Sequence, residues 1–329
     1  MDDSIHPPVQ VVRNLPNLRT LTDISRQRYA LMAATMADGT TLQLPVNVIS
    51  GQRGEQVLLM VAGVHGDEHE GITAQYELWQ ELRPEELTGT VVMVPVANPP
   101  AFRANLRCNP ADMVDMNRIF PGDPAGNITE RLAYQLYREV ALQCDVVLSM
   151  HGWTQGALVT PYVEYPLNSS TTEAARAAAA AFGLDYIEGF EWHPGLLVAA
   201  CAKANIVAIE PEIGGLSCTL PERRDRYKIG ARNLLRHLDM LSGEPGPTNS
   251  ATEVQREMVF APSGGVLHRN KELKDTVEAG EVVATITDLN GTTTASMTTS
   301  CDGFIAATRL AAAVNPGDLV TVIFTEQNR

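Results

Sequence analysis

The sequence predicts an α/β domain with a mainly parallel or mixed sheet, followed by a small all-β domain. Strand-like and helix-like stretches alternate through the first three quarters of the 329 residues, which is typical of α/β folds. Residues 242–250 are rich in Gly, Pro and Ser, as linkers are. Beyond about residue 252 short Thr- and Val-rich segments are separated by glycines, so we predict domains at 1–245 and 252–329.

Each element of the first domain is predicted from its own residue pattern. Apolar runs predict strands at 46–49, 57–62, 90–96, 145–150 and 206–209. Apolar residues at helical spacing predict helices at 71–82, 130–143, 171–182 and 221–241. Functional residues of such sheets lie beyond the carboxyl ends of strands. We therefore expect a shared site where predicted strands end, at His65, Asn98, His151 and Glu212.

The composition excludes several classes of protein. A formal net charge of −14 argues against non-specific nucleic-acid binding, which needs a basic surface. The five cysteines are odd in number and show no Cys-x-x-Cys spacing, so we expect no disulfide framework. We find no signal peptide and no apolar run long enough to cross a bilayer. We expect a cytoplasmic enzyme that acts on a small molecule, and the sequence leaves a homo-oligomer open.

The segment 63–71, Gly-Val-His-Gly-Asp-Glu-His-Glu-Gly, is the most informative motif. It follows a predicted strand and combines imidazole and carboxylate groups, the usual ligands of zinc. A hydrolytic zinc site needs three protein ligands and one open position for water. His65 and Glu68 could supply two ligands, and His151, at the end of another apolar strand, could be the third. We therefore predict one Zn²⁺ per chain, able to acidify a bound water.

A second zinc geometry fits the same residues. His65 to His69 also match His-x-x-Glu-His, the motif of inverted zincins, in which both histidines bind zinc from one helical face and the glutamate is the base. That geometry needs a helix through the motif, whereas a strand enters it and Gly63 and Gly66 disfavour a helix there. We prefer His65 and Glu68 as ligands, with His69 at the start of the following helix.

A loop rich in arginine lies between residues 98 and 122. The planar fork of arginine matches a carboxylate, so Asn117 and Arg118 are candidates for holding a substrate carboxylate. Arg107 is the candidate for polarising the scissile carbonyl and stabilising its oxyanion. The simpler alternative is that these arginines form surface ion pairs. His193, before a Pro-Gly turn, is a candidate pocket residue.

The catalytic base is expected in the segment 209–215, again a strand followed by a turn. A zinc hydrolase needs a carboxylate that takes a proton from water and passes it to the leaving amine. Glu210 and Glu212 are both candidates. Their side chains lie on the same side of an extended chain, so spacing alone does not choose between them.

Taken in order, these motifs resemble the succinylglutamate desuccinylase/aspartoacylase family, a branch of the zinc carboxypeptidase-like fold. The resemblance covers nearly the whole chain and implies a mixed sheet with flanking helices. It also implies hydrolysis of an amide that links an acyl group to an amino acid or similar amine, and it selects Glu212 as the general base. The matching pieces are 63–68, Asn98-Pro99 with Arg107, 115–122, His151 and 212–215.

Two departures from the family pattern bear on the metal and the substrate. Ser149 stands where many members have an aspartate, which would lie near the zinc ligands. The spacing from Arg107 to Asn117 is longer than in aspartoacylase proper and resembles the subgroup that includes N-acetyl-diaminobutyrate deacetylase. This spacing argues against assuming N-acetylaspartate as the substrate.

The C-terminal region resembles a biotinyl/lipoyl-type barrel-sandwich, through the segments 261–265, 282–286 and 315–318. Carrier domains of that type present a lysine at a hairpin tip, and the equivalent segment 288–292 has none. We therefore predict no covalent cofactor and a structural or pocket-lid role.

Together these features predict a zinc-dependent deacylase. Water is activated at zinc, Glu212 moves the proton, Arg107 stabilises the oxyanion, and Asn117 with Arg118 fixes the substrate carboxylate. Two alternatives remain open at this point: a zinc carboxypeptidase that acts on short peptides, and a non-catalytic zinc-binding scaffold that uses the β-domain for assembly.

Overall fold

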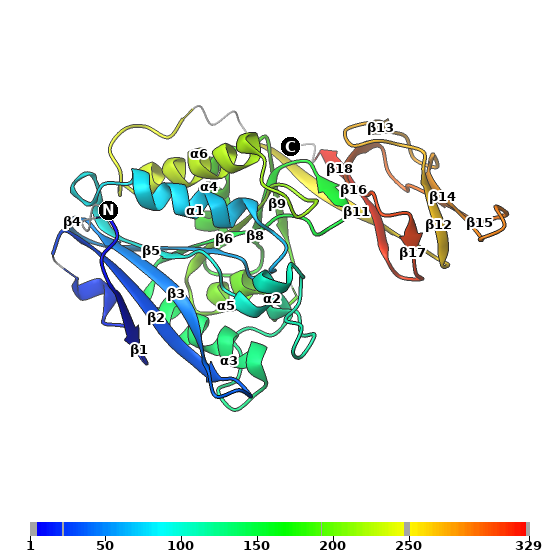
Figure 1. Cartoon of the computed structure of the whole chain (residues 1–329). Helices are drawn as coiled ribbons and strands as arrows, with labels where there is room; N and C mark the ends of the chain where they lie inside the picture. Colours follow the sequence, from blue (N-terminus) through cyan, green and yellow to red (C-terminus); the bar gives the residue numbers. More distant parts are fainter. Residues whose placement is uncertain (1–4, 22, 192, 247–250, 327–329) are drawn as a thin grey trace.

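A computed structural model describes residues 5–21, 23–191, 193–246 and 251–326. The start of the chain at 1–4 and part of the expected linker, 247–250, lie outside the described residues. Within them a large mixed sheet carries helices on both faces, and a separate antiparallel sheet of four strands lies in the C-terminal region (Figure 1). The predicted fold class is confirmed.

The large sheet has 14 strands among the described residues. They are β1 (Val9–Val12), β2 (Ser25–Thr35), β3 (Thr41–Ser50), β4 (Gln52–Ala62), β5 (Thr88–Val94), β6 (Val146–Met150), β7 (Ala157–Val159), β8 (Tyr162–Pro166), β9 (Tyr186–Phe190), β10 (Val207–Glu212), β11 (Thr252–Phe260), β13 (Thr276–Val277), β16 (Gly303–Arg309) and β18 (Leu319–Glu326). The smaller sheet contains β12 (Gly265–Arg269), β14 (Val282–Thr287), β15 (Thr293–Thr298) and β17 (Ala313–Val314). The helices are α1 (Glu70–Glu81), α2 (Pro99–Ala104), α3 (Ile128–Gln135), α4 (Thr172–Phe182), α5 (Leu197–Lys203) and α6 (Pro221–His237).

The central strands of the large sheet position the site. The order across the sheet is β1-β2-β3-β5-β4-β6-β10-β8-β9-β11-β18-β16-β13, with β7 paired to β16. In the middle, β5, β4, β6 and β10 are parallel to one another, and the strands that flank them, β3 and β8, are antiparallel. Parallel strands bring their carboxyl ends to one edge of the sheet, so residues that follow β4, β6 and β10 meet there.

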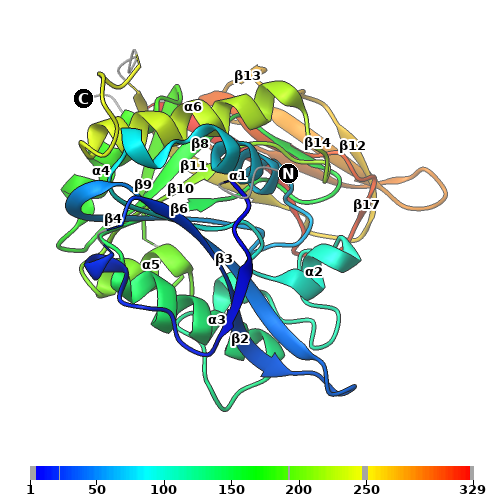
Figure 2. The same cartoon turned by 60° about the vertical axis from the view of Figure 1, so that its left-hand side comes forward.

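Two apolar cores lie on opposite faces of these strands. Helices α1, α4 and α6 bury one set of side chains against one face, and α3 and α5 bury another set against the opposite face. Figure 2 shows the two groups of helices on either side of the sheet. The parallel strands are therefore buried on both faces, which explains why they read as continuous apolar runs such as 57–62.

Most predicted elements of the first domain are present, with shifted ends. Strand β5 ends at Val94, before Pro95, which has no backbone N–H to continue the ladder. The helix predicted at 130–143 begins as α3 at Ile128 and continues through a π-turn and a 3₁₀ turn to Gln143. Strand β10 runs through Glu212, so this residue is the last of its strand. The sequence pattern did not predict β2, β8, β9, α2 and α5.

The large sheet continues across the predicted domain boundary. Strand β11 pairs in parallel with β9, and β7 pairs with β16. A partly buried Arg256 on β11 forms ion pairs with the buried Glu164 and Glu188 of β8 and β9. The division at 245–252 stays a prediction. No helix in the described ranges is long and apolar enough to span a membrane.

Candidate active site

The turn after β4 presents His65 and Glu68. The strand ends at Ala62, and Gly63 follows with a φ of 62°, a conformation that side chains disfavour. A Cβ at Gly66 would lie 2.1 Å from the backbone carbonyl carbon of Ala101, so this position admits only glycine without a shift of α2. The two glycines thus turn the chain sharply and let it pass close to α2.

His151 follows β6, the strand next to β4. The parallel register pairs Ala62 with Met150, so the residues after both strands lie side by side. The backbone N–H of His151 donates to Pro211 O, and its carbonyl accepts from Ile213 N, which joins it to the end of β10. Three strand ends therefore meet at His151.

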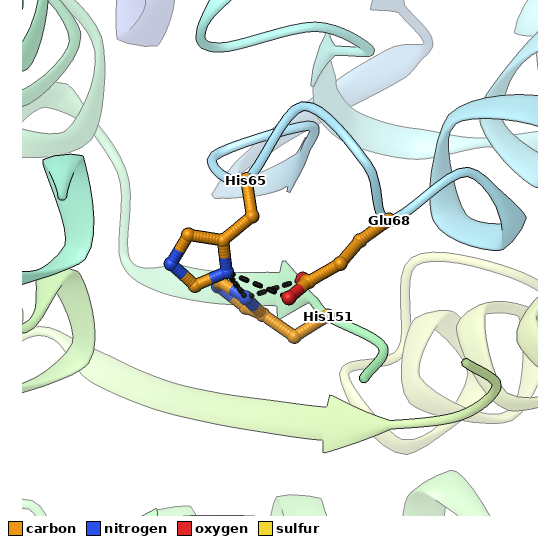
Figure 3. A group of neighbouring side chains, drawn as sticks. All are labelled: His65, Glu68 and His151. Atoms are coloured by element: carbon orange, nitrogen blue, oxygen red, sulfur yellow. Dashed lines mark hydrogen bonds and ion pairs between the residues drawn. The ribbon is translucent and has the colours of Figure 1, made fainter. Parts of the chain in front are cut away.

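The three predicted ligands form one buried cluster (Figure 3). Glu68 Oε1 lies 2.8 Å from His65 Nδ1, and Glu68 Oε2 lies 3.0 Å from His151 Nδ1. The two Nδ1 atoms are 3.2 Å apart. Each side chain is 4% exposed or less. The structure thus brings together residues that lie 86 positions apart in the chain.

The donor set fits a zinc ion. Zinc bonds of 2.0–2.1 Å in a tetrahedral site place the donor atoms roughly 3.3 Å apart, close to the spacing found here. Two imidazole nitrogens and one carboxylate, facing one another with little solvent, are a common hydrolytic zinc set. Burial opposes ionisation of Glu68, but the two histidines lower its pKa well below the usual range, so the carboxylate is ionised.

His69 points away from this cluster. It is the N-cap residue that precedes α1, its Nε2 lies 3.2 Å from Gly66 O, and its ring packs edge-on against Phe102. The chain bends at His65, and the helix starts only at Glu70. These positions do not match the single helical face that the inverted-zincin geometry needs.

Asp115 and Arg107 surround the cluster on the side of His65. Asp115 Oδ1 lies 3.1 Å from His65 Nε2, and Arg107 Nε donates to Asp115 Oδ2 over 3.0 Å. Arg107 Nη1 also donates to Glu68 Oε1 over 3.4 Å. Burial opposes ionisation of Asp115, but His65 and Arg107 lower its pKa. Arg107 is therefore held at the cluster by charge and is partly buried.

Glu210 and Glu212 lie beside His151 at two depths. Glu212 is adjacent to His151 across the strand pair and is partly buried, whereas Glu210 is buried and its Oε2 lies 3.4 Å from His151 Nε2. Burial raises the pKa of Glu212 well above the usual range, and the charges of Glu68 and Glu164 add to this effect. These two glutamates and His151 form a second group of potential metal ligands that shares His151 with the first.

Asn117 and Arg118 lie on the short turn after Asp115. Asn117 is buried, and its Oδ1 accepts the backbone N–H of Leu197 at the start of α5. The Arg118 side chain is exposed and lines a pocket of about 470 Å³ together with His193. Asn117 thus has a structural contact that the sequence did not suggest. His193 lines a pocket, as the sequence predicted, and none of the three cluster residues is among its described lining residues.

Two neighbours of the cluster were not recognised from the sequence. Asp115 begins the segment 115–122, but its position in the sequence gave no indication that it would lie next to His65. Ser149 was noted only as a departure from a family pattern, and its Oγ lies 3.0 Å from His151 Nε2. A polar residue two positions before a ligand, on the same strand face, is the signal that could have found Ser149.

Comparison with known proteins identifies the class of this protein. The family model described as the succinylglutamate desuccinylase/aspartoacylase catalytic domain matches residues 54–238. This span covers more than half of the chain and all seven residues predicted for the site. The chain therefore belongs to the succinylglutamate desuccinylase/aspartoacylase family. It is a hydrolase of the deacylase type, which acts on amide bonds.

Individual relatives agree with this assignment. The N-alpha-acetyl-L-2,4-diaminobutyric acid deacetylase of Halomonas elongata is 33% identical over 293 residues, which cover 86% of this chain and 85% of the relative. The expected likeness to such a deacetylase is confirmed.

Solved structures share the fold over nearly the whole chain. A succinylglutamate desuccinylase/aspartoacylase from Rhodobacter sphaeroides has a TM-score of 0.87 at 26% identity and covers 97% of this chain and 100% of its own. The product-bound ectoine utilization protein EutE (DoeB) from Ruegeria pomeroyi has a TM-score of 0.85 at 25% identity, and the match covers 91% of this chain and 95% of that structure's chain.

Proposed function

We propose that this protein is a zinc-dependent deacylase that cleaves the amide of a small N-acyl amino acid. The observation that carries the proposal is the convergence of His65 Nδ1, His151 Nδ1 and the Glu68 carboxylate in one buried cluster, each donor within 3.2 Å of the others. These three residues would hold one Zn²⁺ per chain. When bound, zinc supplies Lewis-acid activation of water and of the amide carbonyl.

Glu212 is the general acid–base. It ends β10 next to His151, and its Oε2 has no hydrogen-bond partner among the described residues. A carboxylate at this place takes a proton from the attacking water and delivers it to the leaving amine nitrogen. Glu210 lies one row deeper in the sheet and is buried, so Glu212 is the better placed of the two glutamates.

Arg107 stabilises the developing oxyanion. Its guanidinium is fixed by Asp115 and lies at the carboxylate of Glu68, so a positive charge is already in place beside the cluster. Burial alone would lower the pKa of Arg107, but Glu68 and Asp115 raise it. A cation that needs no rearrangement is suited to charge that develops on the carbonyl oxygen.

Arg118 and Asn117 position the substrate carboxylate. Arg118 Nη1 donates to Asn117 O over 2.8 Å, which leaves the other donors of this exposed guanidinium for a ligand. Asn117 fixes the turn through its bond to Leu197 and so holds Arg118 in place. An Arg118→Ala variant should raise the KM for N-acyl amino acids with little change in kcat.

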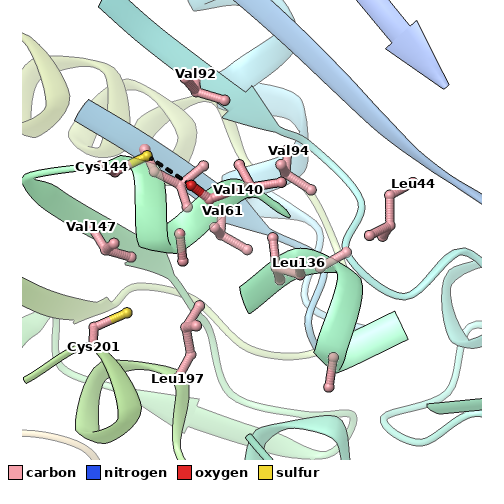
Figure 4. Close-up of a cluster of buried hydrophobic side chains, with 14 of the residues drawn as sticks. Leu44, Val61, Val92, Val94, Leu136, Val140, Cys144, Val147, Leu197 and Cys201 are labelled. Carbon is pink, nitrogen blue, oxygen red and sulfur yellow. Dashed lines mark hydrogen bonds between the residues drawn. The ribbon is translucent and has the colours of Figure 1, made fainter. Parts of the chain in front are cut away.

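The first substrate to test is N-α-acetyl-2,4-diaminobutyric acid, because the relative from Halomonas elongata carries that substrate in its name. A cytoplasmic location is part of the proposal. All five cysteines are free, and Cys144 and Cys201 lie among buried apolar side chains (Figure 4), as suits a reducing compartment.

The predicted domain division, 1–245 and 252–329, and a pocket-lid role of the second part belong to the same proposal. The pocket-lid role is supported by two hydrogen bonds: the backbone N–H groups of Leu310 and Ala311 both donate to the carbonyl oxygen of Gly156, in the loop that follows His151.

The test combines metal reconstitution with a substrate panel. Chelator-stripped protein should be inactive, and one equivalent of Zn²⁺ should restore release of free amine from N-α-acetyl-2,4-diaminobutyric acid. N-acetylaspartate, N-succinylglutamate and an unblocked dipeptide complete the panel. Release from the dipeptide alone would favour a carboxypeptidase. Bound zinc without hydrolysis of any compound would contradict the proposed reaction.

A further inference from the structure

The two ring nitrogens of His151 face different surroundings. Nδ1 faces the cluster, 3.0 Å from Glu68 Oε2. Nε2 faces the opposite way, 3.0 Å from Ser149 Oγ and 3.4 Å from Glu210 Oε2. A neutral imidazole carries one proton, so a ring that offers Nδ1 to a metal must carry its proton on Nε2. That proton then points toward Ser149 and Glu210.

The register of β6 and β10 explains this arrangement. These neighbouring parallel strands pair Leu148 with Ile209, and the pairing continues to His151 beside Glu212. Side chains alternate along a strand, so the residues two positions earlier, Ser149 and Glu210, lie one row deeper on the same face. The sheet itself therefore places a hydroxyl and a carboxylate behind the third ligand.

One oxygen of the buried Glu210 carboxylate has no hydrogen-bond donor among the described residues. The residue is 3% exposed, and its Oε2 accepts no hydrogen bond from any described residue. A buried carboxylate oxygen without a donor is costly, so a facing N–H is of value to both groups. At 3.4 Å the contact with His151 Nε2 is longer than an ideal hydrogen bond and acts mainly through charge.

We propose that Glu210 is a positioning residue that, with Ser149, fixes the proton of His151 on Nε2 and leaves Nδ1 for the metal. The arrangement matches that of His65, whose Nε2 faces the carboxylate of Asp115. Outer carboxylates of this kind orient histidine ligands and strengthen metal binding, and their loss typically weakens it roughly 10–100-fold. The inference rests on the proposed zinc site, and it assigns Glu210 a role distinct from that of Glu212.

The test measures the zinc affinity of the whole 329-residue chain by competition with a chromophoric chelator. Glu210→Gln keeps the shape and removes the charge, and we expect affinity to fall roughly 10–100-fold. Glu164→Gln is the matched control, because Glu164 pairs with Glu210 across β8 and β10 but does not contact His151. Its affinity should equal that of the wild type.

A rescue variant separates positioning from simple damage. Ser149→Asp in the Glu210→Gln background returns a carboxylate to the same Nε2, because Ser149 Oγ already lies 3.0 Å from it. Most of the lost affinity should return. If Glu210→Gln alone does not fold, the double variant decides: folding with wild-type affinity supports the inference, and failure to fold or weak affinity overturns it.

Three further outcomes are distinguishable. Wild-type zinc affinity in Glu210→Gln overturns the positioning role. Unchanged affinity with a loss of turnover above about 100-fold would instead make Glu210 the proton carrier, which also overturns it. A wild-type protein that binds no zinc removes the proposed function itself, whatever the variants do.

Discussion

The carboxylate of Asp115 lies directly behind His65, with its Oδ1 3.1 Å from His65 Nε2. The same carboxylate accepts a hydrogen bond from Arg107 Nε on its other oxygen. One aspartate thus connects the first predicted ligand to the arginine expected at the substrate carbonyl. Changes at Asp115 should therefore affect both metal binding and catalysis.

We expect Asp115→Asn to weaken zinc binding roughly 10–100-fold, because the neutral amide supports the His65 ring less well. The measurement is chelator competition followed by metal analysis. Asp123→Asn is the control, since Asp123 is exposed and caps a nearby turn without contacting a histidine. An Asp115→Asn protein with unchanged zinc affinity and unchanged kcat would remove Asp115 from the site.

Glu212→Gln should lower kcat roughly 10²–10⁴-fold while the protein keeps one zinc per chain, because the amide cannot accept and deliver the proton. Steady-state kinetics with N-α-acetyl-2,4-diaminobutyric acid and metal analysis check this. Glu222→Gln, an exposed glutamate in the first turn of α6, should behave as the wild type. Full turnover by Glu212→Gln would disprove its assignment as the base.

His69→Ala should keep stoichiometric zinc, because His69 contacts Gly66 O and Phe102 rather than the cluster. His151→Ala is the opposite case and should lose most of its zinc. Metal content after dialysis compares the two. If His69→Ala lost its zinc and His151→Ala kept it, the inverted-zincin ligand set would be the correct one.

The stability of the protein should depend on pH through Glu188. Burial raises the pKa of this carboxyl group to about 7, although Arg256 opposes the shift. A carboxyl group whose pKa is raised on folding contributes stability that is fully present below its unfolded pKa, near 4.5. This stability is lost as the pH rises through the folded pKa of about 7.

The Tm advantage of the wild type over Glu188→Gln should therefore shrink as pH rises from the unfolded pKa through about 7. Thermal unfolding at fixed zinc concentration measures the difference. Glu272→Gln provides the comparison, because that side chain is 69% exposed, and its Tm difference from the wild type should be independent of pH. A difference for Glu188→Gln that grows with pH would contradict the expected sign.

The sequence predicted the fold class, and the three predicted ligands lie together in the structure, for a physical reason. Buried parallel strands leave long apolar runs, and glycine with histidine at their ends marks where a site can form. The β4 and β6 runs, with His65 and His151 after them, are of this kind. Short strands and short helices, such as β9 and α5, are stabilised by tertiary contacts and carry weak local patterns.

The outer contacts of the site could not be predicted in the same way. Glu210 and Glu212 have the same periodicity, and only the pairing of β10 with β6 separates their depths. Asp115 reaches His65 across 50 residues of chain, which no local pattern records. Asn117 was expected at the substrate, whereas its observed contact is with the first turn of α5.

The pairing of β9 with β11 has a consequence for how the protein can be divided in the laboratory. A chain that stopped at residue 246 would expose an unpaired strand edge, which invites aggregation. It would also leave Glu164 and Glu188 buried without the guanidinium of Arg256. Truncation at this point is therefore not expected to give a soluble smaller enzyme. The C-terminal strands keep the rest of the chain soluble by covering a strand edge that would otherwise be exposed.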